Sequence, residues 1–202
     1  MTLWCGKDPL ILASQSKARQ MLLANAGLEF ETVTADVDER AIQQASGLSR
    51  PGDIAGLLAR EKALWVSSRR PGQWVIGADQ TLALGSRLFN KPADRAGAAE
   101  QLRLLSGRGH ELHSAVAVAL NGNISFADVS TAHMLMRQLD QIEIDKYLDT
   151  VGEAATASVG AYQLEGLGVH LFERIEGDHF TILGLPLLPL LTFLRSKGLL
   201  GL

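Results

Sequence analysis

The sequence has little cysteine and no strong excess of charge, and both shortages restrict the classes of protein it can represent. Cys5 is the single cysteine among 202 residues, so no disulfide can form within the chain, and no histidine and cysteine cluster has the spacing of a zinc site. We therefore expect a reducing compartment, the cytoplasm. The formal net charge of −3 argues against a nucleic-acid partner, because such proteins usually carry a basic patch or stripe.

Long hydrophobic runs are missing as well. The first nine residues lack a basic segment followed by an apolar stretch, so we expect no export signal. The most apolar segment, residues 180–194, is shorter than a membrane span and contains Pro186 and Pro189, which places it in the core and predicts no membrane association. The content of 47% hydrophobic and 20% charged residues is ordinary for one globular domain, which we expect to cover residues 1–202.

Several common catalytic and nucleotide-binding patterns are also absent. No G-x-x-x-x-G-K-[ST] sequence occurs, which excludes a P-loop, and Gly166-Leu-Gly168 lacks the third glycine of a dinucleotide-binding fingerprint. No serine lies in a G-x-S-x-G turn, so a triad of Ser14, His110 and Asp79 is the weaker hypothesis. His110 and His113 are three residues apart in strand-like sequence, where odd spacing sends side chains to opposite faces, and this disfavours zinc.

Hydrophobic periodicity predicts the fold class. We expect strands over residues 10–13, 30–33, 74–79, 112–120, 124–136 and 169–175. We expect helices after Ser14, from Pro51 through Trp65 to an end near Pro71, and over residues 94–105, 140–148 and 187–197. Asn121-Gly-Asn between two long strands predicts a hairpin. Because helices interleave with strands while the hairpin makes the sheet mixed, we predict a mixed α/β (α+β) protein with three layers, in which helices surround a central mixed sheet.

The first predicted strand leads through a polar turn into a helix. Ser14, Ser16 and Arg19 lie in this turn and at the start of the helix, where free backbone amides and the positive end of the helix dipole suit a phosphate. From this segment alone, an ordinary N-cap at Ser14 or Ser16 and a solvated Arg19 are the more common outcome. The segment therefore leaves both interpretations open.

Asp79 is the last residue of the strand predicted to begin at Trp74, and two small residues before it leave room for a ligand. Open α/β sheets place their ligands at the carboxyl ends of strands. A carboxylate at this position can equally cap a neighbouring helix. Lys91, directly before Pro92, places a cation in a loop and by itself would be interpreted as a surface residue.

Two further segments carry polar candidates. Lys62 lies in a helix rich in alanine and leucine, where it either points along the same cleft or is solvated, which is the commoner arrangement. Glu165 lies in the glycine-punctuated segment 160–168, whose alternating positions could present it to a nucleotide base. A tight turn explains these glycines equally well.

Taken in order, these segments resemble the Maf-like nucleoside triphosphate pyrophosphatases from Leu10 to Leu194. The matching patterns are Leu12-Ala-Ser14-x-Ser16-x-x-Arg19, Asp38-Glu39, Glu61-Lys62-Ala63, Gly77-Ala-Asp79, Lys91-Pro92, Leu105-Ser-Gly-Arg-Gly-His110, Gly160-Ala-Tyr162 and Gly184-Leu-Pro-Leu187. Each match is weak alone, but chance does not account for their collinearity. Two departures from the family pattern, at Lys17-Ala18-Arg19 and at Ser158-Val-Gly160, each leave one contact to the substrate without its usual residue.

The resemblance implies a Maf/ITPase-like fold and an enzyme that hydrolyses a nucleoside triphosphate to the monophosphate and pyrophosphate. It implies a divalent cation, Mg²⁺ or Mn²⁺, near Glu39 and Asp79, and triphosphate contacts from Ser14, Arg19, Lys62 and Lys91. Asp79 is then the main catalytic carboxylate, which deprotonates a water that attacks the α-phosphorus without a covalent intermediate. General chemistry agrees, because phosphoryl transfer is catalysed mainly by positioning and by neutralising charge, and Mg²⁺ needs few protein carboxylates.

Three positions bear on the choice of base: Ala18, Gln80 and Glu165. By resemblance, Gln80 and Glu165 favour the branch that acts on 7-methyl-GTP over the branch that acts on dTTP and UTP, and a carboxylate suits the adjacent N1–H and N2–H donors of guanine. Ala18 stands where the first branch can place an aromatic residue, which leaves methyl-guanine stacking unsupported. The alternatives are a dTTP/UTP pyrophosphatase, a phosphatase that releases orthophosphate, and a non-catalytic nucleotide-binding regulator of cell division. The long hairpin and the apolar C-terminal end are compatible with a homodimer.

Overall fold

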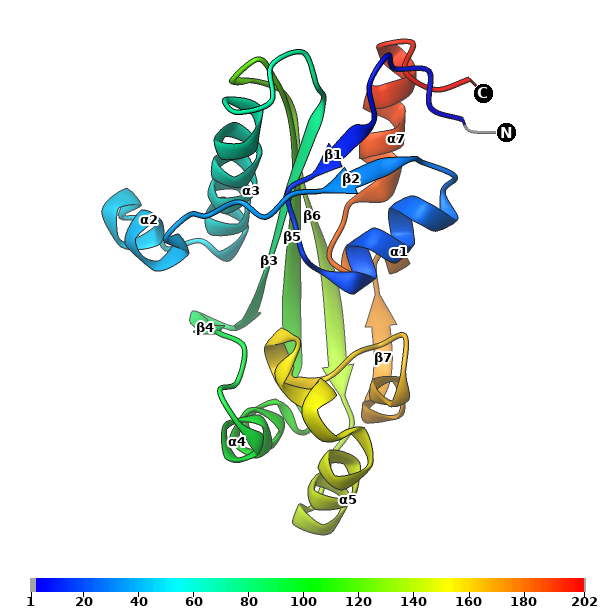
Figure 1. The fold of residues 1–202 in the computed structure, drawn as a ribbon. Coiled ribbons are helices and arrows are strands. Elements are labelled where there is room, and N and C mark those ends of the chain that lie inside the picture. The colour runs from blue at the N-terminus through cyan, green and yellow to red at the C-terminus, as the bar shows by residue number, and fades with distance from the viewer. Residues whose placement is uncertain (1–2, 202) are drawn as a thin grey trace. The chain divides into compact units, whose positions relative to one another are not determined.

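The computed structural model describes residues 3–201, which form helices around a seven-stranded mixed sheet (Figure 1). The strands follow the order β2-β1-β3-β5-β6-β7, and β4 pairs with β3. Their bounds are β1 (Leu10–Leu12), β2 (Phe30–Thr32), β3 (Val75–Leu84), β4 (Arg87–Phe89), β5 (Gly109–Leu120), β6 (Asn123–Met136) and β7 (Phe172–Glu176). The predicted mixed α/β class and the long hairpin, here β5 and β6, are confirmed.

The helices are mostly those that the sequence predicted. They are α1 (Lys17–Asn25), α2 (Glu39–Ser46), α3 (Pro51–Ser67), α4 (Arg95–Leu105), α5 (Gln141–Val151), α6 (His179–Ile182) and α7 (Leu187–Ser196), with short 3-10 helices over Gly152–Thr156, Val159–Ala161 and Leu167–Leu171. Within the described range, no helix combines the length and the apolar character that a membrane span requires.

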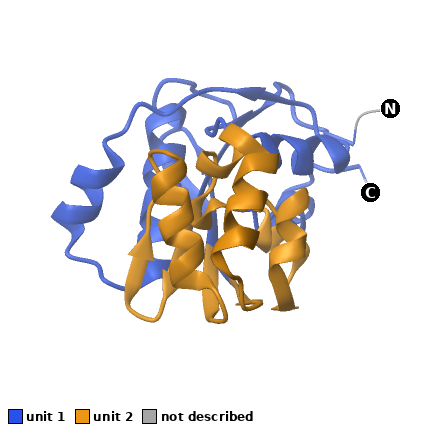
Figure 2. Cartoon of the chain, turned by 90° about the horizontal axis from the view of Figure 1, so that it is seen from below, with its two compact units in different colours: residues 1–80, 114–130, 184–202 blue, residues 81–113, 131–183 orange. Residues whose placement is uncertain are grey.

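The chain divides into two compact units, each built from segments that are not contiguous in sequence (Figure 2). Unit 1 comprises Met1–Gln80, Ser114–Ser130 and Gly184–Leu202, and unit 2 comprises Thr81–His113 and Thr131–Leu183. Strands β3, β5 and β6 each contribute residues to both units. The single domain expected over residues 1–202 stays a prediction.

In unit 1, small side chains let α3 lie close against the sheet. Residues of α3 four positions apart face alternate residues of β5, and the buried contact is made of alanines: Ala55, Ala59, Ala63, Ala115, Ala117 and Ala119. β3 comes equally close, because a Cβ atom at Gly77 would overlap the carbonyl oxygen of Ala59 and the amide nitrogen of Ala63. On the other side of the strands, α7 packs through Phe193, which stacks on Phe126 of β6 at 4.8 Å (Figure 1).

Unit 2 has an apolar core of its own. Alternate residues of β5 and β6 face α4 and α5, among them Leu112, Met134 and Met136, which are almost completely buried. His110 is on this buried face, whereas His113 is on the opposite face beside Glu111. The prediction that these two histidines point to opposite faces is therefore confirmed.

Strand β3 is longer than predicted. The sequence indicated that the strand ends at Asp79, but β3 continues to Leu84, so Asp79 lies in its middle. The physical reason is the antiparallel partner β4, which supplies hydrogen bonds to Leu82–Leu84 that the sequence pattern did not reveal. The parallel neighbour β1 pairs with β3 only at Ile11 and Leu12, so the turn after β1 lies beside the Asp79 region.

Two other parts of the fold differ from the prediction, the start of the last strand and the segment after Asp38. The strand predicted over residues 169–175 begins only at Phe172, because Leu167–Leu171 forms a 3-10 helix that brings glycine-rich sequence onto the core. The acidic loop around Asp38 continues into α2, which was not predicted. Asp38 caps this helix, since its carboxylate accepts a hydrogen bond of 2.9 Å from the amide of Ala41.

Candidate functional site

The turn between β1 and α1 is organised around the guanidinium of Arg19. Ser16 is the N-cap of α1, and its hydroxyl accepts a hydrogen bond from the Arg19 amide. Arg19 Nη1 donates to Ser14 Oγ at 3.0 Å and to the carbonyl oxygen of Ala78 at 2.9 Å, while Nε donates to the carbonyl oxygen of Gly184 at 2.7 Å. The N-cap at Ser16 is confirmed, and the alternative of a solvated Arg19 is wrong.

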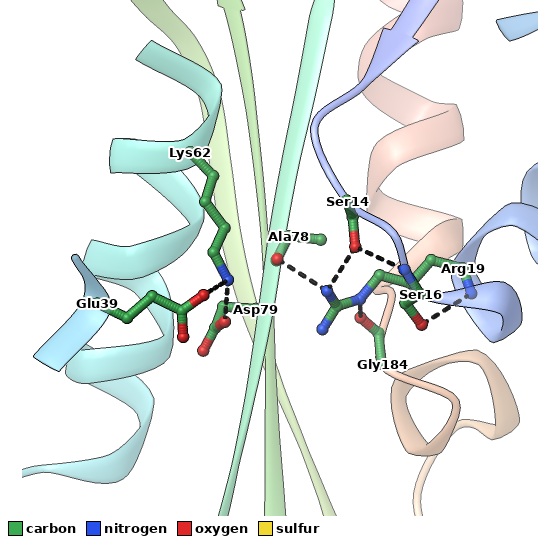
Figure 3. Close-up of polar contacts among 8 residues, drawn as sticks. All are labelled: Ser14, Ser16, Arg19, Glu39, Lys62, Ala78, Asp79 and Gly184. Atoms are coloured by element: carbon green, nitrogen blue, oxygen red, sulfur yellow. Dashed lines mark hydrogen bonds and ion pairs between the residues drawn. The ribbon is translucent and has the colours of Figure 1, made fainter. Parts of the chain in front are cut away.

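Lys62, Glu39 and Asp79 form a second cluster in the same unit (Figure 3). The Lys62 ammonium lies 2.7 Å from Glu39 Oε1 and 2.7 Å from Asp79 Oδ1. The side chains of Lys62 and Asp79 are only 12% and 11% exposed, whereas Glu39 is 52% exposed. The alternative of a solvated Lys62 is therefore wrong, because this largely buried lysine joins two carboxylates.

Ala78 and Asp79 connect the two clusters. The backbone carbonyl oxygen of Ala78 accepts a hydrogen bond from Arg19, and the side-chain carboxylate of the next residue, Asp79, accepts one from Lys62 (Figure 3). One short stretch of β3 therefore positions both cations of the site.

Burial controls the protonation of this site. Burial raises the pKa of Asp79, and the positive charges of Lys62 and Arg19 act in the opposite direction. Burial also lowers the pKa of the Arg19 guanidinium, although Asp79 and Glu39 oppose this effect and arginine stays protonated. With two cations and two carboxylates, the cluster is close to neutral, so an additional anion requires additional positive charge.

The carboxylates of Glu39 and Asp79 have the chemistry of ligands for Mg²⁺ or Mn²⁺. They converge on one cationic atom, and oxygen ligands are what hard divalent cations prefer. Among the residues that the structure describes, no group of three or more histidine, cysteine, aspartate or glutamate side chains is arranged to hold a metal ion. A site with two carboxylates still fits Mg²⁺, which commonly completes its coordination with water and substrate phosphates.

The other four candidate residues are distributed over the two units. Gln80 belongs to unit 1 and donates a hydrogen bond of 2.9 Å to Ser114 Oγ, and Ala18 lies on α1. Lys91 and Glu165 are exposed residues of unit 2. The roles assigned to these four residues stay predictions.

The segment that carries Glu165 is anchored by a buried tyrosine. Tyr162 Oη lies 2.8 Å from His110 Nε2, and the ring of Phe172 packs edge-on against the Tyr162 ring. Just before it, Gly160 and Ala161 have φ angles of 81° and 62°, a left-handed conformation that is rare for alanine. Unit 2 therefore holds this segment in a defined turn.

Sequence reasoning missed several hydrogen-bond acceptors of the site. The carbonyl groups of Ala78 and Gly184 accept from Arg19, and Ser114 accepts from Gln80. In the sequence, Gly184 is recognisable only as the first residue of the motif Gly184-Leu-Pro-Leu187. Its φ of +94° is a conformation that favours glycine, and a Cβ atom there would lie 3.4 Å from Arg19 Nε. The presence of glycine at this motif position was the feature of the sequence that could have indicated a close backbone contact.

Comparison with known proteins gives a consistent result. A sequence model of the family described as Maf-like protein matches residues 9–197. A relative from Rhodopseudomonas palustris, named nucleoside triphosphate pyrophosphatase, is 69% identical over 201 residues, which are 100% of both chains. A relative from Brucella abortus, named 7-methyl-GTP pyrophosphatase, is 53% identical over 93% of this chain and 96% of its own length. A solved structure from Mycobacterium abscessus, titled nucleoside-triphosphatase / dITP/XTP pyrophosphatase, aligns with 95% of this chain and 96% of its own at 16% identity, with a TM-score of 0.41.

Proposed function

Because this chain belongs to the family of Maf-like proteins, we propose that it hydrolyses a nucleoside triphosphate to the nucleoside monophosphate and pyrophosphate. The observation that carries the proposal is the meeting of Lys62 with Glu39 and Asp79, beside the buried hydrogen bonds of Arg19. The full-length relative at 69% identity, which is named for this activity, supports it.

The positive side chains bind the triphosphate. A nucleoside triphosphate carries about four negative charges, and its hydrolysis is promoted by cations that neutralise the phosphate oxygens. Arg19 and Ser14, at the start of α1, contact phosphate oxygens, and the amides at the N-terminus of this helix favour the same charge. Lys62 and Lys91 provide two further contacts.

Glu39 and Asp79 are the residues that would hold a divalent cation, Mg²⁺ or Mn²⁺. When bound, it supplies positive charge to the phosphate oxygens and favours ionisation of water. The Glu39 carboxylate is exposed to solvent, whereas the Asp79 carboxylate is buried and would bind the cation from the protein interior.

Asp79 is the general base. It accepts a proton from water while the water oxygen forms a bond to the α-phosphorus, and the bond from this phosphorus to the bridging oxygen breaks, so pyrophosphate leaves with the electron pair. Burial raises the pKa of the Asp79 carboxylate, which makes it a stronger base than an exposed aspartate. In the nucleotide-free protein, Lys62 at 2.7 Å favours the ionised form of this carboxylate and holds its orientation.

The test is product analysis on a panel of nucleoside triphosphates with Mg²⁺. We expect one equivalent of pyrophosphate for each monophosphate formed, and a folded Asp79→Asn variant should lose about 100-fold or more in turnover. Orthophosphate as the first product would assign a phosphatase instead. Nucleotide binding without turnover would assign a non-catalytic regulator.

For the base, we propose a purine nucleotide, with 7-methyl-GTP as the leading candidate. Glu165 is an acceptor that matches two adjacent donors of guanine, and 7-methylation adds a positive charge that attracts this carboxylate. The relative named 7-methyl-GTP pyrophosphatase, at 53% identity, supports the same choice. A preference for dTTP or UTP in the nucleotide panel would reject it.

A further inference from the structure

Lys62 occupies the position between Glu39 and Asp79 in which a divalent cation would be expected. We infer that the Lys62 ammonium is an exchangeable occupant of this position, which holds the two carboxylates together in the nucleotide-free protein and leaves them when the divalent cation binds. This inference rests on the proposed function, because it concerns the same pair of carboxylates. It adds that metal binding and the placement of a phosphate-binding lysine are one event.

The distances allow such an exchange with little movement of the carboxylates. Glu39 Oε1 and Asp79 Oδ1 each lie 2.7 Å from Lys62 Nζ, so the two oxygens are no more than twice this distance apart. Oxygen ligands of Mg²⁺ lie at about 2.0–2.1 Å, so each oxygen would need to move inward by only about 0.6 Å. The same two oxygens can therefore serve either cation.

Simultaneous occupancy is unfavourable. Lys62 and Asp79 are almost enclosed, at 12% and 11% side-chain exposure, so little water lies between the charges to weaken their interaction. A divalent cation on the same two oxygens would repel an ammonium that remained in place. The net charge also disfavours simultaneous binding of both cations, because the Lys62 ammonium already neutralises one of the two carboxylates.

The exchange requires the side chains of Glu39 and Lys62 to move, and both are able to do so. Asp79 is held in β3, and the backbone of Lys62 is held by α3, whose neighbouring residue Ala63 packs in the alanine contact with the sheet. Glu39 is the first residue of α2 and is 52% exposed, so it can open toward solvent. The lysine side chain is a flexible stem of four carbons, so its ammonium can move toward an incoming phosphate while α3 stays in place.

Binding of Mn²⁺ to the nucleotide-free, full-length protein tests this inference without measuring activity. We would compare wild type with Lys62→Met, which keeps the length of the side chain and removes its charge, using the electron paramagnetic resonance signal of free Mn²⁺. Loss of the competing ammonium should lower the Kd for Mn²⁺ about tenfold or more. Lys146→Met removes an exposed lysine of unit 2 outside the proposed site and should leave this Kd unchanged.

A double variant locates the effect. In Lys62→Met/Glu39→Gln one of the two carboxylates is removed, so the gain in Mn²⁺ affinity should disappear. If Lys62→Met binds Mn²⁺ no more tightly than wild type, or if the gain persists without the Glu39 carboxylate, the inference is wrong.

A second measurement covers the case in which Lys62→Met does not fold, since that variant leaves two carboxylates without their cation. Wild-type protein with 13Cε-labelled lysine would be titrated with Mg²⁺, and the Lys62 resonance would be identified by its absence from Lys62→Arg. A change in this resonance that saturates together with Mg²⁺ binding supports the exchange, and an unchanged resonance overturns it. If wild type releases no pyrophosphate, the proposed function fails. If wild type releases pyrophosphate but Lys62 shows neither response, only the exchange fails.

Discussion

Arg19 Nε donates a hydrogen bond of 2.7 Å to the carbonyl oxygen of Gly184, and this bond joins positions 165 residues apart in the chain. Within residues 3–201, the hydrogen bonds of this guanidinium use Nε and Nη1, so Nη2 is the nitrogen that can face a phosphate oxygen. Arg19 therefore ties the start of α1 to β3 and to the segment before α7, and these bonds hold its guanidinium in one orientation. Several predictions about single residues depend on contacts of this kind.

Arg19→Lys should be costly although the charge is kept. An ammonium cannot reproduce the three bonds to Ser14, Ala78 and Gly184, so buried acceptors lose their donor, which costs about 1–3 kcal/mol of stability. We also expect kcat/KM to fall about tenfold or more. Urea unfolding and steady-state kinetics measure the two effects. Lys17→Ala, at an exposed position of the same helix, should change neither, and wild-type stability of Arg19→Lys would contradict the structural role.

Gly77→Ala should damage both the fold and the site. The added Cβ would overlap backbone atoms of Ala59 and Ala63, so α3 must move away from β3 and carry Lys62 away from Asp79. Overpacking of this kind costs about 1–3 kcal/mol, and turnover should fall with it. The shift in thermal unfolding should be absent from Gly109→Ala, where an added Cβ meets no neighbouring atom within 4 Å. Equal behaviour of the two variants would argue against the close packing of α3 on β3.

The pH dependence of turnover should report Asp79. A general base must be ionised, and burial raises the pKa of Asp79 above the ordinary value of 3.8. The rate should therefore fall with decreasing pH as this carboxyl group takes up a proton. A pH profile of kcat at saturating substrate measures it. A rate that stays constant as the pH falls to 4 would remove Asp79 as the base.

The stability of unit 2 should depend on His110. Burial lowers the pKa of His110 from 6.5 to about 4, so the folded state favours the neutral imidazole. The stability due to this group is fully present above pH 6.5 and is lost as the pH falls toward 4, because the unfolded chain binds the proton first. The loss amounts to about 3 kcal/mol, since one pKa unit corresponds to about 1.4 kcal/mol.

Urea unfolding at a series of pH values would measure this loss. His110→Asn should be less stable than wild type at pH 7, because Tyr162 loses its partner, but its stability should change less between pH 6.5 and 4. His170→Asn, at an exposed position, should keep the wild-type dependence. An identical slope in His110→Asn and wild type would contradict the assignment.

Glu165→Gln should change the choice of base. A glutamine amide can match the alternating donor and acceptors of uracil, whereas the carboxylate accepts only. We expect the ratio of kcat/KM for UTP to that for 7-methyl-GTP to rise about tenfold. Competition between the two nucleotides in one reaction measures this ratio directly. Glu153→Gln, another exposed glutamate of unit 2, should leave it unchanged; the same ratio in Glu165→Gln and wild type would show that Glu165 does not contact the base.

The sequence by itself determined the features that depend on short-range chemistry. Ser16 and Asp94 cap helices whose first-turn amides lie three residues further on, so their hydroxyl or carboxylate predicts the helix start. The Asn121-Gly-Asn turn between two apolar segments specified the hairpin in the same way. The collinear motifs identified the residues of the candidate site, although not how their side chains meet.

Only the tertiary structure decided the partners of the charged residues. Lys62 is bonded to Glu39 and Asp79 because small residues of α3 and Gly77 of β3 allow these elements to touch, and no local pattern around Lys62 distinguishes this arrangement from solvation. The length of β3 likewise depended on β4, a strand too short to be recognised. Hydrogen bonds between distant segments follow from packing, whose outcome depends on the whole core, so they become visible only once the chain has folded.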